Sequence, residues 1–149
     1  MPAGRIEWLS DLVRLEIALW NRIDTRLREE HDLPLAFFWP LYVVERSPDG
    51  SLRVGAVAEA LGLTVGGASK IIDRIVSAGL LRREVDPADR RASRVALTDA
   101  GTQTLDAARE TYEAAMAIVL DASLSLVEQD CMHSLVRRIL DATDAGDFR

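Results

Sequence analysis

Arginine and aspartate side chains are concentrated in one short stretch of the sequence, EVDPADRRASRVALTDAG, which begins at Glu84. Within nine residues it holds Asp86, Asp89, Arg90, Arg91 and Arg94. Arginine presents a fixed fork of N–H donors that matches carboxylates and phosphates. Because short alternating runs flank the cluster, the stretch predicts a β-hairpin whose tip binds a polyanion.

Charge is divided unevenly along the chain. The 149 residues have a net charge of -6 at pH 7, yet residues 53–94 carry eight basic and five acidic side chains and are therefore +3. The rest of the chain is then -9. A net acidic protein is a poor partner for nucleic acid, but a locally basic face can bind phosphate while the acidic remainder limits non-specific attraction.

The elements that position this hairpin are mostly helices. Segment 6–30 places apolar side chains at helical spacing, and a second helix is expected over 35–47. Another is expected over 99–121, and an S-x-x-E capping box at Ser125 opens a last helix to about Thr143. The predicted fold class is mainly α with a small β-wing (α+β).

A helix-turn-helix is predicted in the middle of the chain, in the run LRVGAVAEALGLTVGGASKIIDRIVSAGLL. A short helix over about 54–61 is followed by a glycine turn. A second helix starts after Thr64, whose hydroxyl can accept from the first-turn amides, and ends at Gly79. The arms LLRREV and SRVALT then enclose a tip at 86–92.

The second helix of this motif has a small, polar outer face opposite a row of apolar side chains. Such a face suits the major groove of DNA, although any surface helix is polar outside and apolar inside. Gly66 and Gly67 leave backbone amides bare for a phosphate at the helix start. Asp73 repels phosphate unless it pairs with Lys70 or accepts from a cytosine amino group. The predicted DNA contacts are Thr64, Gly66, Gly67, Ser69, Lys70 and Arg74.

The hairpin tip is narrow enough for the minor groove, whose negative potential favours an inserted arginine. Either Asp86 or Asp89 can brace a long arginine through a charge-assisted hydrogen bond. The predicted wing contacts are therefore Arg90, Arg91 and Arg94. The alternative is a solvated loop that is charged only because it is exposed.

The helix-turn-helix and the wing motif R-x-x-D-P-x-D-R-R-x-x-R-x-x-L-T-x-x-G together resemble the MarR family of winged helix-turn-helix transcriptional regulators. The resemblance covers nearly the whole chain, and the wing motif is its more specific part. It implies a single subunit over 1–149, with dimerisation helices over 6–34 and 99–143 on either side of a winged helix-turn-helix region, 35–98.

The resemblance also implies a homodimer that represses by binding a pseudo-palindromic operator in double-stranded DNA. Aligned on L-T-x-x-G, Asp89 and Arg91 fall on the family's D-x-R wing positions, so Arg91 is the expected minor-groove contact and Asp89 its brace. The paired glycines of the recognition helix depart from the family pattern, in which Ser, Thr or Arg is common there. Base readout then falls to Ser69, Lys70 and Arg74, and to DNA shape.

Members of this family often bind small aromatic or phenolic ligands between the dimerisation helices and the winged region. The resemblance therefore implies a small aromatic or anionic ligand that releases the DNA. Aromatic side chains at helical spacing also serve as ordinary core. The candidates for the pocket are Trp20, Phe38, Trp39 and Tyr42, with Arg14 or Arg22 as the partner of an anion.

Other classes of protein find less support. Two histidines, one cysteine and no G-x-S-x-G, H-E-x-x-H or P-loop motif give no basis for an enzyme, so neither a cofactor nor a metal site is expected. Cys131 has acidic neighbours, which disfavour the thiolate of a redox sensor, and D-C-M-H is weak support for a metal sensor. A winged-helix interaction module without DNA binding is the remaining alternative, but such a module does not need the wing arginines.

The chain is expected to be cytoplasmic. Its single cysteine fits a reducing compartment, and its first residues meet charges too early for a signal peptide. It has no apolar run long enough to span a membrane.

Overall fold

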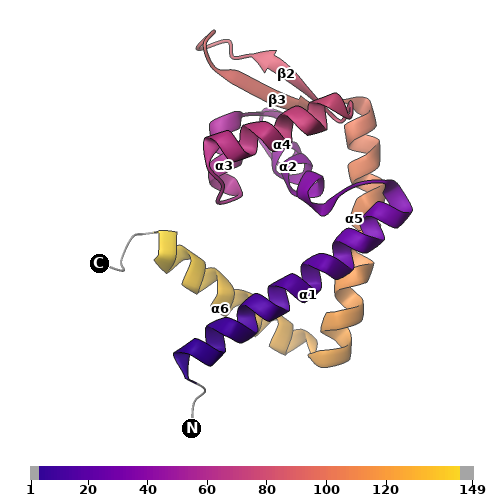
Figure 1. The fold of residues 1–149 in the computed structure, drawn as a ribbon, viewed down its shortest axis with the longest axis vertical. Coiled ribbons are helices and arrows are strands. Elements are labelled where there is room, and N and C mark those ends of the chain that lie inside the picture. The colour runs from indigo at the N-terminus through magenta and orange to yellow at the C-terminus, as the bar shows by residue number, and fades with distance from the viewer. Residues whose placement is uncertain (1–3, 145–149) are drawn as a thin grey trace. The chain divides into compact units, whose positions relative to one another are not determined.

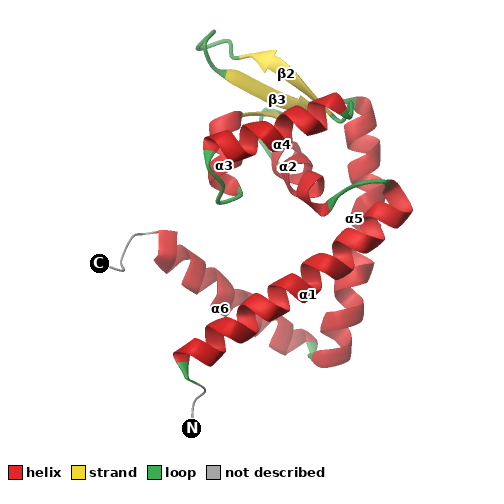
Figure 2. Ribbon diagram, viewed as in Figure 1, coloured by secondary structure: helices red, strands yellow, loops and turns green. Residues whose placement is uncertain are grey.

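The computed structural model describes residues 4–144 as helices with one small antiparallel sheet (Figures 1 and 2). Within α5 the chain divides into two compact units, one ending at Tyr112 and the other beginning at Glu113. The helices and the small sheet confirm the predicted mainly helical fold with a β-wing. The elements in chain order are α1 (Arg5–His31), α2 (Leu35–Glu45), β1 (Ser51–Arg53), α3 (Val54–Ala60), α4 (Val65–Ser77), β2 (Leu81–Val85), β3 (Ser93–Leu97), α5 (Asp99–Ser123) and α6 (Leu126–Asp144).

The turn from α1 to α2 is closed by a side chain of α1. Asp32 ends α1 in the left-handed conformation, with φ 50°, and Pro34 precedes the first residue of α2. The Asp24 carboxylate accepts a hydrogen bond from the Leu35 amide at 2.8 Å. That amide would otherwise have no partner within the helix, so α1 caps α2 and fixes where it starts.

Helix α2 is the centre of the first unit. It is apolar almost all round, and six of its eleven residues are buried. A helix with this pattern is stable only inside a core. It contacts α1, α3 and α4, together with β1 and β3, so the helix-turn-helix and the sheet are built on one buried element.

The sheet has three strands in the order β1-β3-β2, all antiparallel. The sequence predicted only the β2–β3 hairpin, and that hairpin is confirmed with its tip at 86–92. The prediction omitted β1, in which Leu52 faces Val95 of β3. Three residues are too few to show a strand period, and β1 forms only because β3 offers its free edge.

The threonine and glycine of L-T-x-x-G join the wing to α5. Thr98 donates from its amide to the Leu80 carbonyl (3.1 Å) and from its hydroxyl to the Gly79 carbonyl (2.6 Å), while its hydroxyl oxygen accepts from the Gly101 amide (3.0 Å). A Cβ atom on Gly101 would lie 1.9 Å from the Leu80 carbonyl oxygen. Only glycine lets the first turn of α5 come this close to the chain before β2.

The second unit confirms the predicted capping box. The Ser125 amide donates to the Glu128 carboxylate at 2.8 Å, and the Glu128 amide returns to the Ser125 hydroxyl at 3.4 Å. Parts of the predicted subunit 1–149, namely 1–3 and 145–149, lie outside the described residues. No single described helix is long and apolar enough to cross a membrane, although α3 and α4 taken as a bent pair would pass on length and composition alone.

We expect Gly101→Ala to lower the free energy of unfolding by about 1–3 kcal/mol, because the added methyl group overpacks a backbone contact. Gly66→Ala is the matched control, since its Cβ would meet nothing within 4 Å. In a helix that change is expected to stabilise by up to about 1 kcal/mol. Urea unfolding of both variants measures the difference, and equal midpoints would contradict the packing argument.

Candidate nucleic-acid interface

Helices α3 and α4 form the predicted helix-turn-helix, with an angle of 109° between them. The Thr64 hydroxyl caps α4 by accepting from the Gly67 amide at 3.1 Å, as predicted. A Cβ atom on Gly67 would lie only 3.1 Å from that hydroxyl, whereas one on Gly66 would meet nothing within 4 Å. A side chain at residue 67 would therefore crowd the cap slightly, whereas Gly66 has no such neighbour within the subunit.

The two faces of α4 are arranged as predicted, except at one residue. Ala68, Ile72 and Ile75 are buried, Lys70, Asp73 and Ser77 are exposed, and Ser69 is half-buried. The exception is Ile71, which belongs to the predicted apolar row of α4 but is only half-buried and lines a pocket. The polar face of α4 is thus free for a partner.

Asp73, the acidic residue on that face, is neutralised by the wing. Its carboxylate accepts from the Arg83 guanidinium of β2 at 2.5 Å. The predicted pairing with Lys70 is not among the ion pairs of the described residues. The sequence could not select Arg83 as the partner, because the contact depends on how α4 packs against β2.

Arg74 lies at the flank of α4. Its guanidinium carbon is 5.4 Å from the centre of the Phe37 ring of α2, a cation–π contact. The side chain is exposed beside this contact. Its position at the edge of the polar face agrees with the expected flanking role, while contact with DNA stays a prediction.

The base of the wing is built on the carboxylate of Asp86, which is only 2% exposed. It accepts from the Arg53 guanidinium at 2.5 Å and from the Ala88 amide at 2.8 Å. The hydrogen bond from Arg53 is the main reason why the pKa of Asp86 lies below its ordinary value, while burial acts in the opposite direction. Asp86 therefore carries its charge at neutral pH and fastens the wing to β1.

Arg94 also belongs to the base of the wing rather than to its tip. Its side chain is 20% exposed and donates to the hydroxyl and the carbonyl of Ser51, at 2.9 and 2.8 Å. It lies 3.8 Å from Asp86. Asp86 was expected to brace an arginine at the tip, and it instead holds Arg53 and approaches Arg94. Sequence reasoning missed Arg53, because nothing local marks it as a partner of Asp86.

The tip itself is shaped by Asp89. Its carboxylate accepts from the backbone amide of Arg91 at 3.0 Å, and its carbonyl accepts from the Ala92 amide at 2.9 Å. The predicted brace therefore acts on the main chain of Arg91 and not on its guanidinium. Arg90 and Arg91 are exposed, and among the described residues no hydrogen bond or ion pair holds either guanidinium. Two cations are thus presented on a turn of fixed backbone.

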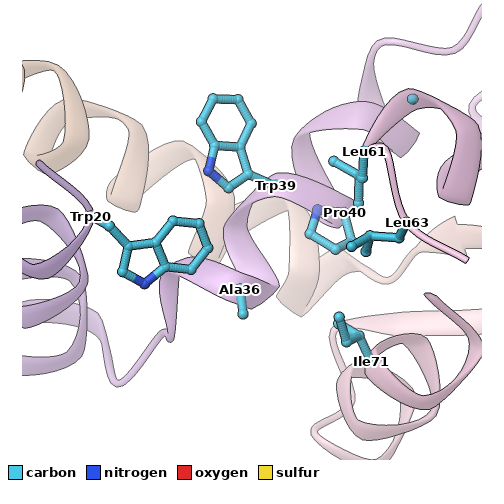
Figure 3. A pocket seen from close by; sticks show the side chains of 8 residues that line it. Trp20, Ala36, Trp39, Pro40, Leu61, Leu63 and Ile71 are labelled. Carbon is cyan, nitrogen blue, oxygen red and sulfur yellow. The ribbon is translucent and has the colours of Figure 1, made fainter. Parts of the chain in front are cut away.

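A pocket of about 350 Å³ lies behind the recognition helix, in the first unit (Figure 3). The tryptophans of α1 and α2 line it on one side, and residues of the helix-turn-helix lie across Ala36 and Pro40 from them. Every lining side chain is aliphatic or aromatic. The lining residues are Trp20, Ala36, Trp39, Pro40, Ala60, Leu61, Leu63 and Ile71.

Of the four aromatic residues predicted for a pocket, Trp20 and Trp39 line it and the other two do not. Phe38 is 3% exposed and stacks on Tyr112 with 4.8 Å between ring centres. Tyr42 accepts from Arg46 at 3.0 Å. Residues 38 and 42 are one turn apart and share the face of α2 that points away from the pocket. Neither Arg14 nor Arg22 is among the described lining residues.

The features considered for redox or metal sensing lie on α6. Cys131 is exposed there as a free thiol. Within residues 4–144, no three His, Cys, Asp or Glu side chains are grouped as a metal ion would require.

The chain is similar in sequence to one protein family and to one curated regulator. A model of the MarR family matches residues 31–92, from the end of α1 to the wing tip. The uncharacterized HTH-type transcriptional regulator YwaE of Bacillus subtilis (strain 168) is 26% identical over 132 residues, which cover 89% of this chain and 75% of YwaE.

Two solved structures share the fold. Sco3205, a MarR family transcriptional regulator from Streptomyces coelicolor in complex with DNA, matches with a TM-score of 0.85 and 22% identity, over 95% of this chain and 88% of Sco3205. The PcaV transcriptional regulator from the same organism matches with a TM-score of 0.71 and 26% identity, over 95% of this chain and 99% of PcaV. PcaV has also been solved in complex with its natural ligand.

We expect Asp86→Asn to lower the free energy of unfolding at neutral pH, because Arg53 and Arg94 lose the charge between them. A carboxyl group with a lowered pKa stabilises the fold above its ordinary pKa of 3.8 and stops doing so as the pH falls through its folded value. The difference between wild type and variant should therefore shrink in acid. Urea unfolding at pH 7 and near pH 3 measures it.

The control for this prediction is Asp49→Asn. Asp49 is 80% exposed and lies 3.7 Å from the same Arg94. An exposed pair contributes little, so this variant should match wild type at both pH values. An equal loss in both variants would show that Asp86 is no more than a surface charge.

Proposed function

We propose that this chain belongs to the MarR family, whose model matches residues 31–92, and that it is a cytoplasmic, homodimeric transcriptional repressor that binds a pseudo-palindromic DNA operator. One observation carries the proposal: a recognition helix with a polar, exposed face and a wing with two unpaired arginines stand on the same unit (Figure 1). The Asp73–Arg83 ion pair joins them. Helix and wing are therefore presented to a partner as one surface.

The proposed docking places α4 in the major groove and the wing in the minor groove. Pairing with Arg83 removes the repulsion that Asp73 would exert on phosphate. Ser69 and Lys70 then face the base edges. The Thr64 hydroxyl already binds the Gly67 amide, so the amides of Val65 and Gly66 are the ones that face a phosphate. At the wing, Arg91 enters the minor groove and Arg90 binds the phosphate backbone of the DNA. Arg94 acts indirectly, by holding the base of the wing.

The proposed homodimer rests on apolar surface that one chain leaves uncovered. No described residue of α6 is buried, although Met132, Leu135, Val136, Ile139 and Leu140 follow each other at helical spacing. Helix α1 exposes apolar residues in the same way, among them Ile6 at 87%. Apolar stripes of this length favour burial against another protein surface, and a second copy offers the same stripes. Two recognition helices would then lie about 34 Å apart, one turn of DNA.

We expect Arg91→Ala to weaken binding to the DNA upstream of the protein's own gene by about 1–3 kcal/mol. The logarithm of affinity should also fall less steeply with salt, because each subunit loses one cation that displaces counterions from the duplex. Fluorescence anisotropy at two salt concentrations, with unrelated DNA of equal length as competitor, measures both effects. Sedimentation in the same buffer should give twice the chain mass of 16.4 kDa.

The matched control is Arg138→Ala, which removes an exposed arginine from α6, outside the proposed DNA-binding surface. It should bind DNA as wild type does. If wild-type protein binds neither fragment at low salt, the repressor proposal fails and a winged-helix interaction module becomes the better reading. If a reductant or a chelator alone switches binding, a redox- or metal-responsive regulator replaces the ligand-responsive one.

We further propose that a small, uncharged aromatic ligand releases the DNA by occupying the pocket behind α4. The lining carries no charge to meet an anion, and burying an unpaired carboxylate is costly. Leu61 and Leu63 of the turn and Ile71 of α4 belong to the lining. A ligand there touches the recognition helix from behind, so it can favour one position of α4 over another.

We expect naphthalene to quench the fluorescence of Trp20 and Trp39 and to lower the affinity for DNA. We expect 2-naphthoate to bind at least about tenfold less tightly than naphthalene, because its carboxylate has no partner in the pocket. Trp8→Phe removes the background from an exposed tryptophan. Ala36→Leu, which fills part of the pocket, should reduce naphthalene binding and leave DNA affinity intact. Equal binding of the two compounds would argue for an anion site.

A further inference from the structure

Val65 is the first residue of α4, and 59% of its surface is exposed. It lies outside the buried core and is not among the residues that line the pocket behind the helix. Single exposed valines are ordinary on protein surfaces, so exposure alone indicates nothing. The position of Val65 at the start of α4 is what indicates a role in binding.

That position is the reading end of the recognition helix. In a helix-turn-helix, the N-terminal residues of the second helix contact base edges. Side chains of a helix tilt toward its N-terminus, so Val65 projects beyond the start of α4. Ser69 lies one turn further along the same edge of the polar face. Val65 is therefore the apolar residue that would enter the major groove first.

Gly66 is the second observation, and it is independent of the first. A glycine within a helix costs about 1 kcal/mol relative to alanine. At Gly67 a Cβ would lie 3.1 Å from the Thr64 hydroxyl, which is a tight contact. Gly66 has none, since its Cβ would meet nothing within 4 Å. The absent side chain leaves a notch beside Val65 on the surface that faces outward.

We propose that Val65 contacts the C5 methyl group of a thymine in each half of the operator, and that Gly66 leaves the space for this base edge to approach. Thymine is the base that presents a methyl group in the major groove. Contact between an apolar side chain and that methyl group removes apolar surface from water, which is favourable. The hydroxyl of Ser69 and the ammonium of Lys70 gain nothing comparable from it. The inference rests on the proposed DNA-binding function and assigns part of its sequence preference.

The test uses the full-length protein and a duplex that wild type selects from random DNA. Each thymine of one half-site is replaced in turn by deoxyuridine, which removes the methyl group and nothing else. Wild type is expected to lose about fourfold in affinity at one thymine, the equivalent of one unburied methyl group. Val65→Ala, which removes both γ-methyl groups, should bind the thymine and deoxyuridine duplexes equally. Val65→Thr keeps one γ-methyl group and should retain part of the difference.

Two controls make the comparison specific to this contact. Val127→Ala changes a valine of α6 that is 78% exposed, and it should keep the full fourfold ratio. Gly66→Ala should weaken binding to the thymine duplex without loss of folding stability. The proposal is overturned if no deoxyuridine weakens wild type, or if Val65→Ala stays as sensitive as wild type. Failure to select any duplex would instead overturn the DNA-binding function itself, and this inference with it.

Discussion

The carboxylate of Asp86 is the contact on which the presentation of the wing depends. It is buried at the point where the hairpin leaves the sheet, with the Arg53 guanidinium at 2.5 Å and that of Arg94 at 3.8 Å. A buried carboxylate is stable only with such partners, and removing either side leaves an unpaired charge. Because Arg53 belongs to β1 and Arg94 to β3, this one group ties both strands to the tip.

Two further contacts extend that arrangement to the helices. The Asp73–Arg83 pair connects α4 with β2, and the Thr98 and Gly101 contacts hold the first turn of α5 against the chain before β2. The recognition helix and the wing are consequently fixed to each other in the first unit. Their relative position decides whether both can enter neighbouring grooves of one duplex. Residues outside the proposed DNA-binding surface thus determine how the residues within it are placed.

The apolar residues divide into three groups with different roles. Those of α2 form the core that carries the winged helix-turn-helix, and those at the pocket leave about 350 Å³ behind α4. Those on α6 and on α1 up to Ile17 remain exposed in the single chain. The first group stabilises the unit. In the proposed function, the second admits a small molecule and the third binds a second copy. Similar side chains serve all three, so their type alone does not separate the roles.

Features that depend on neighbours along the chain could be predicted from the sequence. The Thr64 cap, the Ser125 capping box, the hairpin with its arginine-rich tip and the two faces of α4 follow from residues a few positions apart. Features that depend on residues far apart in sequence are set by the fold. It paired Asp86 with Arg53 and Asp73 with Arg83, drew Arg94 into the base of the wing, and turned Phe38 and Tyr42 away from the pocket. Local spacing sets helix periods and caps, whereas an ion pair between strands requires the register that folding alone supplies.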